Sequence, residues 1–170
     1  SLLLHFESED TSIIFDDFLK RDITQDIPLE HGSIYVIANI PYYITTPIIE
    51  HVLASGLDID GMTLLVQKEV AERLTAKTGT RLAGAITYAV EYYSDATSVI
   101  KVPKKSFVPS PKVESEVIKL KVRKNKKIQV EDERLLFNII SKSFMQRRKT
   151  LSNALLNNNI MNNKEDVNKM

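Results

Sequence analysis

The sequence of 170 residues contains no cysteine and no apolar run that approaches the length of a membrane span. The absence of cysteine excludes disulfide bonds and thiolate metal sites, and it is the usual composition of proteins from a reducing compartment. His5, His31 and His51 have no metal-ligand spacing among them. The opening segment SLLLHFESED has no basic region and too short an apolar run for a signal peptide. We therefore expect a cytoplasmic protein without a metal site or a membrane association.

Positive charge is scarce in the first part of the chain and concentrated directly after it. Residues 1–100 contain 6 basic and 15 acidic residues, a net charge of −9. Residues 101–127 contain 10 basic and 2 acidic residues, a net charge of +8, whereas residues 128–170 have a net charge of +2. Such a basic run is typical of either a solvated surface or a nucleic-acid-binding surface, and charge alone does not separate the two.

The pattern of apolar residues predicts an open α/β sheet followed by helices. Strands are predicted over 11–15, 34–38, 62–67, 97–102 and 116–122, and helices over 45–55, 68–76, 82–93, 131–145 and 148–157. The last two strands alternate like an antiparallel pair. Ligands of open α/β sheets bind beyond the carboxyl ends of the strands. Asp17 and Asn39 each follow a predicted strand, so we expect them at the same edge of the sheet.

The stretch ANIPYYITTP at 38–47 combines residues suited to binding an amino group on a flat ring. The Asn39 side-chain oxygen and the Ile40 carbonyl, held in a turn by Pro41, are two acceptors for one exocyclic –NH₂. Tyr42 can lie flat against the ring that carries this group. Two acceptors would draw the amine of an adenine toward a more nucleophilic geometry. The alternative is a strand that ends in a proline turn with two half-buried tyrosines, and the four residues alone leave both interpretations open.

Five segments resemble, in their order along the chain, the ribosomal RNA adenine dimethyltransferases. They are DDFL at 16–19, NIPY at 39–42, LLVQKEVAERL at 64–74, FVPSPKVES at 107–115 and FMQRRKTLSNAL at 144–155. The resemblance covers about residues 11–157. The last segment favours the small-subunit (KsgA-like) branch over the branch that confers antibiotic resistance by modifying large-subunit RNA.

The resemblance implies a Rossmann-like class I methyltransferase sheet, with its first strands absent, and a small C-terminal helical domain. We expect residues 1–127 to form a partial S-adenosylmethionine-dependent methyltransferase domain and residues 128–170 an incomplete helical RNA-binding domain. The implied reaction is N6,N6-dimethylation of adjacent adenines near the 3′ end of small-subunit rRNA, as a step of rRNA processing in ribosome biogenesis. The implied cofactor is S-adenosyl-L-methionine, and the implied partner is the assembling small ribosomal subunit. We expect a monomer.

The resemblance also assigns roles to single residues. The catalytic set is Asn39, Ile40, Pro41 and Tyr42; the cofactor-binding set is Asp17, Phe18 and Asn39; the substrate-binding set is Tyr42, Phe107, Lys104, Lys105, Lys112, Arg147, Arg148 and Lys149. Phe107 would stack on the target base opposite Tyr42, and the basic residues would follow RNA phosphates. The alternative for Phe107 is a core residue under a loop. Lys124, Lys126 and Lys127 are interpreted as part of a polar strand face and a solvated linker, and His51 as structural. Tyr43, Tyr88, Tyr92 and Tyr93 are interpreted as packing residues.

Glycine is also scarce, and this departs from the family's pattern. The family has a glycine-rich turn after its first strand, but none of the five glycines here forms a G-x-G turn. The sequence therefore resembles the later two-thirds of such an enzyme, and we expect this chain alone to bind the cofactor poorly and to be inactive. One alternative is a non-catalytic nucleic-acid-binding module of the same family. Another, DNA adenine methylation, shares the Asn-x-Pro-Tyr logic but not the Gln-Arg-Arg-Lys segment.

Overall fold

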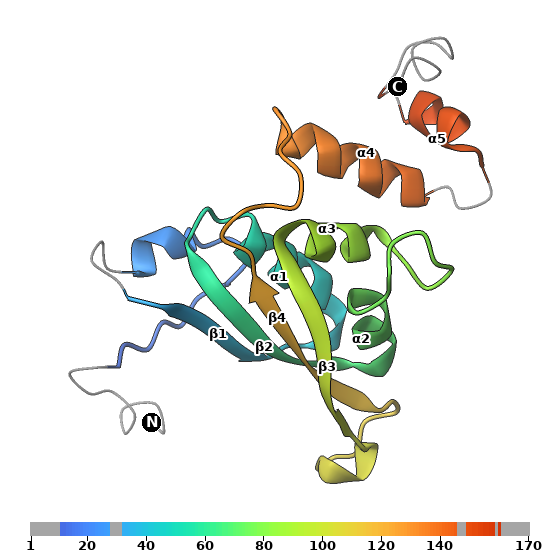
Figure 1. Ribbon diagram of the computed structural model, residues 1–170. Helices are drawn as coiled ribbons and strands as arrows, with labels where there is room; N and C mark the ends of the chain where they lie inside the picture. The colour runs from blue at the N-terminus through green and yellow to red at the C-terminus, as the bar shows by residue number, and fades with distance from the viewer. Residues whose placement is uncertain (1–10, 28–31, 146–148, 159, 161–170) are drawn as a thin grey trace.

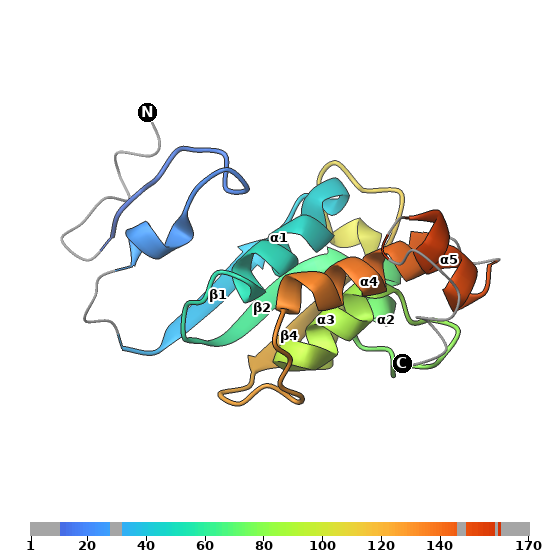
Figure 2. The same cartoon turned by 90° about the horizontal axis from the view of Figure 1, so that it is seen from above.

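The structure, a computed structural model, describes residues 11–27, 32–145, 149–158 and 160. It is a four-stranded sheet with helices packed on one face, followed by a further pair of helices (Figures 1 and 2). The strands are β1 Ile34–Asn39, β2 Ile59–Gln67, β3 Ser94–Val102 and β4 Ser115–Val122. The α-helices are α1 Thr45–Leu53, α2 Lys68–Leu74, α3 Ala85–Tyr93, α4 Glu133–Met145 and α5 Leu151–Asn157, and short 3₁₀ turns are η2 Ile23–Asp26, η3 Tyr42–Ile44 and η4 Lys104–Ser106.

The strands lie in the order β1-β2-β4-β3. β1 and β2 are parallel, with Asn39 opposite Leu65, and α1 connects them. β4 is antiparallel to both of its neighbours, β2 and β3. The predicted open α/β sheet and the predicted antiparallel pair at its end are therefore confirmed.

The predicted strand over residues 11–15 is wrong. Only Thr11 forms an isolated bridge, and the rest of the segment is irregular. Ile14 is 48% exposed and Phe15 is 94% exposed, so the apolar pattern does not mark a buried strand here. A strand is stable only when a neighbouring strand pairs with its backbone, and within the described residues this segment is not part of the four-stranded sheet.

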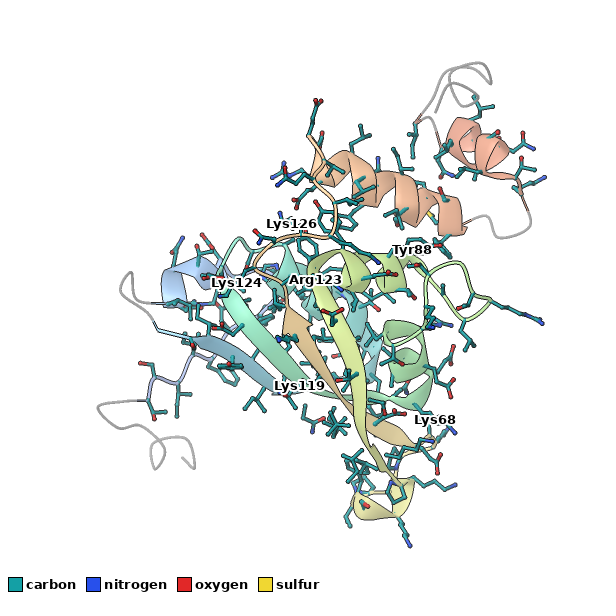
Figure 3. All side chains as sticks on the ribbon, viewed as in Figure 1. Lys68, Tyr88, Lys119, Arg123, Lys124 and Lys126 are labelled. Atoms are coloured by element: carbon teal, nitrogen blue, oxygen red, sulfur yellow. The ribbon has the colours of Figure 1, made fainter. Side chains whose placement is uncertain are left out.

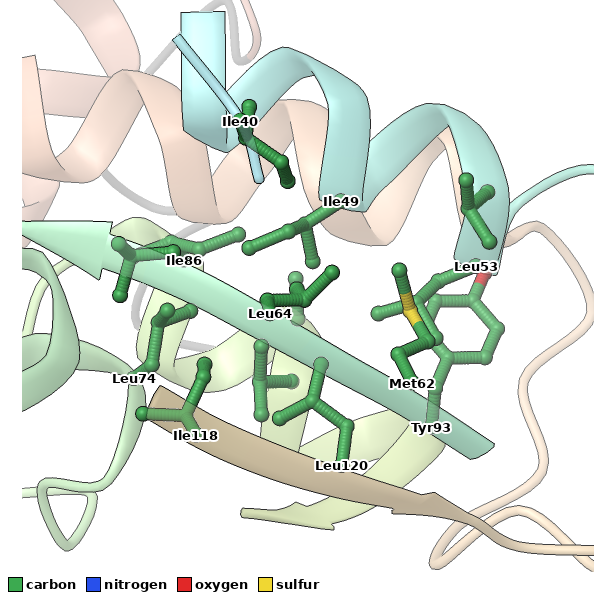
Figure 4. Close-up of a cluster of buried hydrophobic side chains, with 14 of the residues drawn as sticks. Ile40, Ile49, Leu53, Met62, Leu64, Leu74, Ile86, Tyr93, Ile118 and Leu120 are labelled. Atoms are coloured by element: carbon green, nitrogen blue, oxygen red, sulfur yellow. The ribbon is translucent and has the colours of Figure 1, made fainter. Parts of the chain in front are cut away.

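The hydrophobic core lies between the sheet and helices α1, α2 and α3 (Figure 4). Alternate residues of the two central strands point into it, including Leu64 of β2 and Ile118 of β4, both with no exposed surface. Ile49 and Val52 stand three residues apart on α1 and cover the same face of the sheet. Burying one such side chain contributes about 1.5–3 kcal/mol. The core thus fixes the register of β2 and β4.

The opposite face of the sheet is not covered by helices of the described chain. On β1, Tyr35 is 64% exposed and Ile37 is 83% exposed. On β3, Ile100 is 59% exposed. The burial of β1 therefore alternates strictly, with one face on the core and the other open.

Helix α4 is attached to the end of α3 by one carboxylate. The hydroxyl of Tyr92 donates to Glu133 Oε1 at 3.0 Å, and the hydroxyl of Tyr93 donates to Oε2 at 2.7 Å. Lys126 forms an ion pair with the same carboxylate. Phe137, one turn further along α4, stacks on Tyr93 and meets Tyr92 edge-on. Burial raises the pKa of Glu133, but the hydrogen bonds from Lys126, Tyr93 and Tyr92 outweigh it, so the net pKa is lowered.

We predict that Glu133→Gln lowers the free energy of unfolding by about 1–2 kcal/mol at pH 7, because charged hydrogen bonds to two phenols are lost. Since the carboxyl has a lowered pKa in the folded protein, its contribution is present above its unfolded pKa and is lost as the pH falls through the folded pKa. The difference between the two proteins should therefore shrink in acid. Urea denaturation at several pH values measures it, with the exposed neighbour Glu131→Gln as control. An equal loss in both variants would contradict the assignment.

Candidate functional site

Three connections of the sheet meet at one edge. β1 ends at Asn39, β2 ends at Gln67, and β4 begins opposite Gln67 at Ser115. The connection from β3 to β4 closes this edge and is drawn in yellow at the lower end of the sheet in Figure 1. Carboxyl ends of parallel strands and the start of an antiparallel strand thus share one rim, the position at which open α/β sheets bind ligands.

The Asn39–Tyr42 turn leaves β1 at this edge with two acceptors available. Ile40 is 3% exposed and anchors the turn in the core. Pro41 has φ −56° and ψ 131°, and its carbonyl oxygen accepts from the Ile44 N–H at 3.1 Å. Among the described residues, neither the Asn39 side chain nor the Ile40 carbonyl oxygen has a hydrogen-bond partner. The two acceptors predicted from the sequence are therefore not engaged by the described part of the chain.

Tyr42 is fixed across the edge by a residue to which the sequence assigned no role. Its hydroxyl lies 2.6 Å from the Ser115 hydroxyl oxygen, and the two share a hydrogen bond. Ser115 is 1% exposed, whereas Tyr42 is half-buried. Tyr43 is 86% exposed, so the prediction that it is a packing residue is wrong. Ser115 belongs to the segment FVPSPKVES, but nothing in that segment by itself indicates a partner 73 residues away.

The loop between β3 and β4 carries Phe107 and the predicted lysines. Phe107 is half-buried, and Lys104, Lys105 and Lys112 are exposed. The Lys104 carbonyl accepts from the Ser110 hydroxyl at 2.9 Å, which closes the loop on itself. The other end of the loop is tied to α2 by the hydrogen bond from the Lys68 N–H to the Glu114 carbonyl oxygen at 3.0 Å.

The basic residues divide into two groups by their partners. Arg123 pairs with Asp95, Lys124 with Asp58 at 2.8 Å and Asp60 at 3.2 Å, Lys126 with Glu133, and Lys127 with Glu91. Figure 3 shows Arg123, Lys124 and Lys126 where the sheet leads into α4. The hydrogen bond from Lys124 lowers the pKa of Asp60, and that from Lys127 lowers the pKa of Glu91.

The loop lysines differ from this group. Lys104, Lys105 and Lys112 form no ion pair within the described part of the chain. Lys124, Lys126 and Lys127 are exposed, as expected for a solvated linker, but each also pairs with an acidic residue, which the sequence did not predict. The loop beside the Asn39–Tyr42 turn thus carries positive charge without an acidic partner in the described part of the chain. A polyanion can reach this charge.

The acidic turn at 16–19 packs on α1. The ring of Phe18 meets the ring of His51 edge-on at 5.5 Å between centroids. His51 Nε2 lies 3.1 Å from the Arg21 carbonyl oxygen, to which it donates. Asp17 accepts from the Leu19 N–H at 3.2 Å and pairs with Lys20 at 3.2 Å. His51 is structural, as predicted.

These contacts correct the expectation that Asp17 and Asn39 share an edge because each follows a strand. Asp17 follows no strand. Its neighbour Phe18 contacts His51 in the last turn of α1, and α1 runs back from the edge at which β1 ends. The turn packs against an aromatic ring on the helix because no paired strand precedes it to carry it to the end of the sheet.

The second predicted basic cluster is described only in part. Arg147 and Arg148 lie outside the described residues. Lys149 is exposed and directly precedes Thr150, whose side chain accepts from the Asn153 N–H and caps α5. With Arg81 and Phe144, Lys149 borders a cavity of about 430 Å³.

In the part of the chain that the structure describes, no helix is long and apolar enough to cross a membrane.

The fold and the turn together define a class of protein. A sheet of parallel and antiparallel strands, with helices between them and an Asn-Ile-Pro-Tyr acceptor turn after a parallel strand, is a Rossmann-like methyltransferase architecture. The chain belongs to the ribosomal RNA adenine dimethylase family, whose model matches residues 2–170.

Known relatives agree with this assignment. The ribosomal RNA small subunit methyltransferase A of Geobacillus thermodenitrificans (strain NG80-2) is 47% identical over 153 residues, which are 88% of this chain and 52% of the relative. A dimethyladenosine transferase from Plasmodium falciparum, known from a crystal structure, has a TM-score of 0.64 and 32% identity, over 76% of this chain and 47% of its own. The 23S rRNA methyltransferase ErmE shares the fold, with a TM-score of 0.59 and 24% identity over 83% of this chain and 54% of its own. The chain spans about half the length of the curated relatives it matches.

We predict that His51→Ala releases the segment at 16–21 from α1 while the sheet stays folded. The substitution removes both the ring contact with Phe18 and the hydrogen bond to Arg21. Trypsin cleavage after Lys20 and Arg21 should become about fivefold faster, the factor that corresponds to about 1 kcal/mol of lost local stability. Glu50→Gln, which removes neither contact, is the control. Unchanged cleavage in His51→Ala would show that other contacts hold the segment.

Proposed function

We propose that this chain supplies the catalytic turn and the base-binding edge of an adenine N6,N6-dimethyltransferase that modifies small-subunit rRNA. The observation that supports this most is the pair of unengaged acceptors, Asn39 Oδ1 and the Ile40 carbonyl oxygen, at the end of β1 beside Tyr42. Relatives named ribosomal RNA small subunit methyltransferase A favour the small subunit as the source of the RNA. The proposed targets are adjacent adenines near the 3′ end of that RNA, modified during ribosome biogenesis.

The proposed chemistry needs no strong base. The two acceptors each bind one hydrogen of the adenine N6 amine, which reduces the delocalisation of its lone pair into the ring. S-adenosyl-L-methionine would supply the methyl group on a sulfonium that this lone pair attacks. The S–CH₃ bond would break as the N6–CH₃ bond forms, and S-adenosylhomocysteine would leave as the neutral thioether. The two oxygen dipoles would stabilise the positive charge that develops on N6, and the extra proton would then pass to water.

The cofactor would be held at the edge by Asn39. Phe18 packs on His51 in the last turn of α1, away from this edge, so Asp17 and Phe18 are left out of the proposed cofactor site.

The target base would be clamped between Tyr42 and Phe107. Enzymes that act on a base first unstack it, at a cost of about a few kcal/mol. Stacking on an aromatic side chain returns about 1–3 kcal/mol for each base. Two aromatic faces would therefore offset the unstacking.

The RNA backbone would follow the exposed lysines of the loop. Lys104, Lys105 and Lys112 form the first group, and Arg147, Arg148 and Lys149 form the second.

In this proposal residues 1–127 belong to the methyltransferase domain and residues 128–170 to the helical RNA-binding domain. The protein would act in the cytoplasm as a monomer on the assembling small subunit.

We predict that Asn39→Ala reduces methyl transfer by about a hundredfold or more, as expected for the loss of one transition-state hydrogen-bond acceptor. The assay measures transfer from labelled S-adenosylmethionine to unmethylated small ribosomal subunits. It uses the chain alone and the chain joined to those parts of the Geobacillus thermodenitrificans relative that lie outside the match. Asn138→Ala, an exposed asparagine on α4, is the control. If the joined protein binds subunits but transfers no methyl group, the catalytic proposal fails and a non-catalytic binding module remains.

We further predict that the double substitution Lys104→Ala and Lys105→Ala weakens the salt dependence of RNA binding. Each phosphate contact to single-stranded RNA contributes about 0.7 to the slope of log K against log salt, so the slope should fall by about 1.4. The matched control is Lys126→Ala with Lys127→Ala, which removes lysines engaged in ion pairs. The control should lower stability and leave the slope unchanged. A slope that falls only in the control would place the RNA path along the linker instead.

A further inference from the structure

Ser115 occupies a rigid position in the sheet and faces the catalytic turn. It is the first residue of β4 and lies opposite Gln67 of β2 and Val102 of β3, so two backbone ladders fix it. Its side chain is 1% exposed, and its hydroxyl oxygen lies 2.6 Å from the hydroxyl oxygen of Tyr42. A buried hydroxyl with a defined partner is a strong positional restraint because leaving it unpaired costs about 1–3 kcal/mol.

The hydrogen bond to Ser115 restrains the hydroxyl end of the Tyr42 side chain, which the backbone of the turn does not restrain. Pro41 fixes the backbone at the start of the turn, but the tyrosine ring still rotates about its side-chain bonds. The bond to Ser115 holds the far end of the ring. The phenolic O–H prefers to lie in the plane of its ring, so a hydrogen bond in a fixed direction also restrains rotation of the ring about the Cβ–Cγ bond. A ring that stacks on a base must keep the plane of that base.

Ser115 also directly follows the loop that carries Phe107. The preceding residue, Glu114, is bonded through its carbonyl oxygen to the Lys68 N–H at 3.0 Å. The hydroxyl that restrains Tyr42 thus stands at the fixed end of the loop that supplies the opposite face of the clamp. Ser115 therefore links Tyr42 to the end of this loop.

We propose that Ser115 is a positioning residue, whose hydrogen bond sets the plane of the Tyr42 ring against the target adenine. This inference rests on the proposed function. Ser115 touches neither the amine nor the methyl donor and acts only through Tyr42. Its loss therefore lowers kcat for methyl transfer and leaves the KM for S-adenosylmethionine unchanged.

The test uses the joined protein described above and four variants: Ser115→Ala, Ser115→Thr, Tyr42→Phe and the double variant Ser115→Ala with Tyr42→Phe. We expect kcat to fall about tenfold in Ser115→Ala, the factor that corresponds to the loss of one hydrogen bond. Ser115→Thr, which keeps the hydroxyl, should restore most of it. Tyr42→Phe keeps the ring and should match Ser115→Ala, and the double variant should lose nothing more. The fluorescence of 2-aminopurine at the target position should be less quenched in both single variants, because the base stacks less well.

Ser94→Ala is the matched control for a purely structural effect. Ser94 is also 1% exposed and begins β3 at the opposite end of the sheet, where its hydroxyl donates to the Val90 carbonyl oxygen at 3.0 Å. It should lower stability without changing kcat or the fluorescence. Unchanged kcat in Ser115→Ala beside an active wild-type protein, or losses that add in the double variant, would overturn the inference alone. A wild-type joined protein that transfers no methyl group would overturn the proposed function and this inference with it. If Ser115→Ala does not fold, Tyr42→Phe decides by the same kinetic and fluorescence criteria.

Discussion

The insertion of β4 between β2 and β3 is the constraint on which the rest of the structure depends. This strand makes antiparallel ladders on both sides, and its buried residues Ile118 and Leu120 fill the core under the helices. Its first residue reaches Tyr42 in the turn that follows β1, and Arg123, directly beyond its end, pairs with β3. A slip of one residue would turn the core side chains to the open face and would remove Ser115 from Tyr42. The site and the core therefore share one register.

The charge asymmetry of the sequence has two physical origins, and the structure separates them. The basic residues that follow β4 form ion pairs with acidic residues from the first part of the chain, namely Asp58, Asp60, Glu91 and Asp95. This part of the basic run stabilises the join between the sheet and α4. The lysines of the β3–β4 loop have no such partners in the described part of the chain. The interpretation as a solvated surface thus applies to the residues that follow β4, whereas nucleic-acid binding by the loop lysines stays a proposal.

Much of the fold could be predicted from local patterns. The predictions that failed share one cause, which is that they depend on contacts between residues far apart in the sequence. The strands at 34–38 and 62–67 and the helix at 82–93 follow from periodicity and from flanking turn residues, and each is present with shifted ends. The apolar run at 11–15 has the same local pattern but no partner strand in the sheet. The acceptor turn was recognisable because its four residues are adjacent. Ser115 was not, because its role arises from a contact with a distant residue, which no local pattern encodes.

The attachment of α4 has a consequence for everything that follows it. Glu133 is bonded to both tyrosines, and Phe137 packs on the same two rings one turn later. Two anchors spaced along a helix fix its direction and its rotation as well as its starting point. Each residue of an α-helix turns the chain by about 100°. Inserting a single residue between these anchors would swing the face of α4 that meets α5 by that angle, although no contact inside the sheet would change. The number of residues in this one turn of α4 thus determines how the helical end of the protein is rotated relative to the sheet.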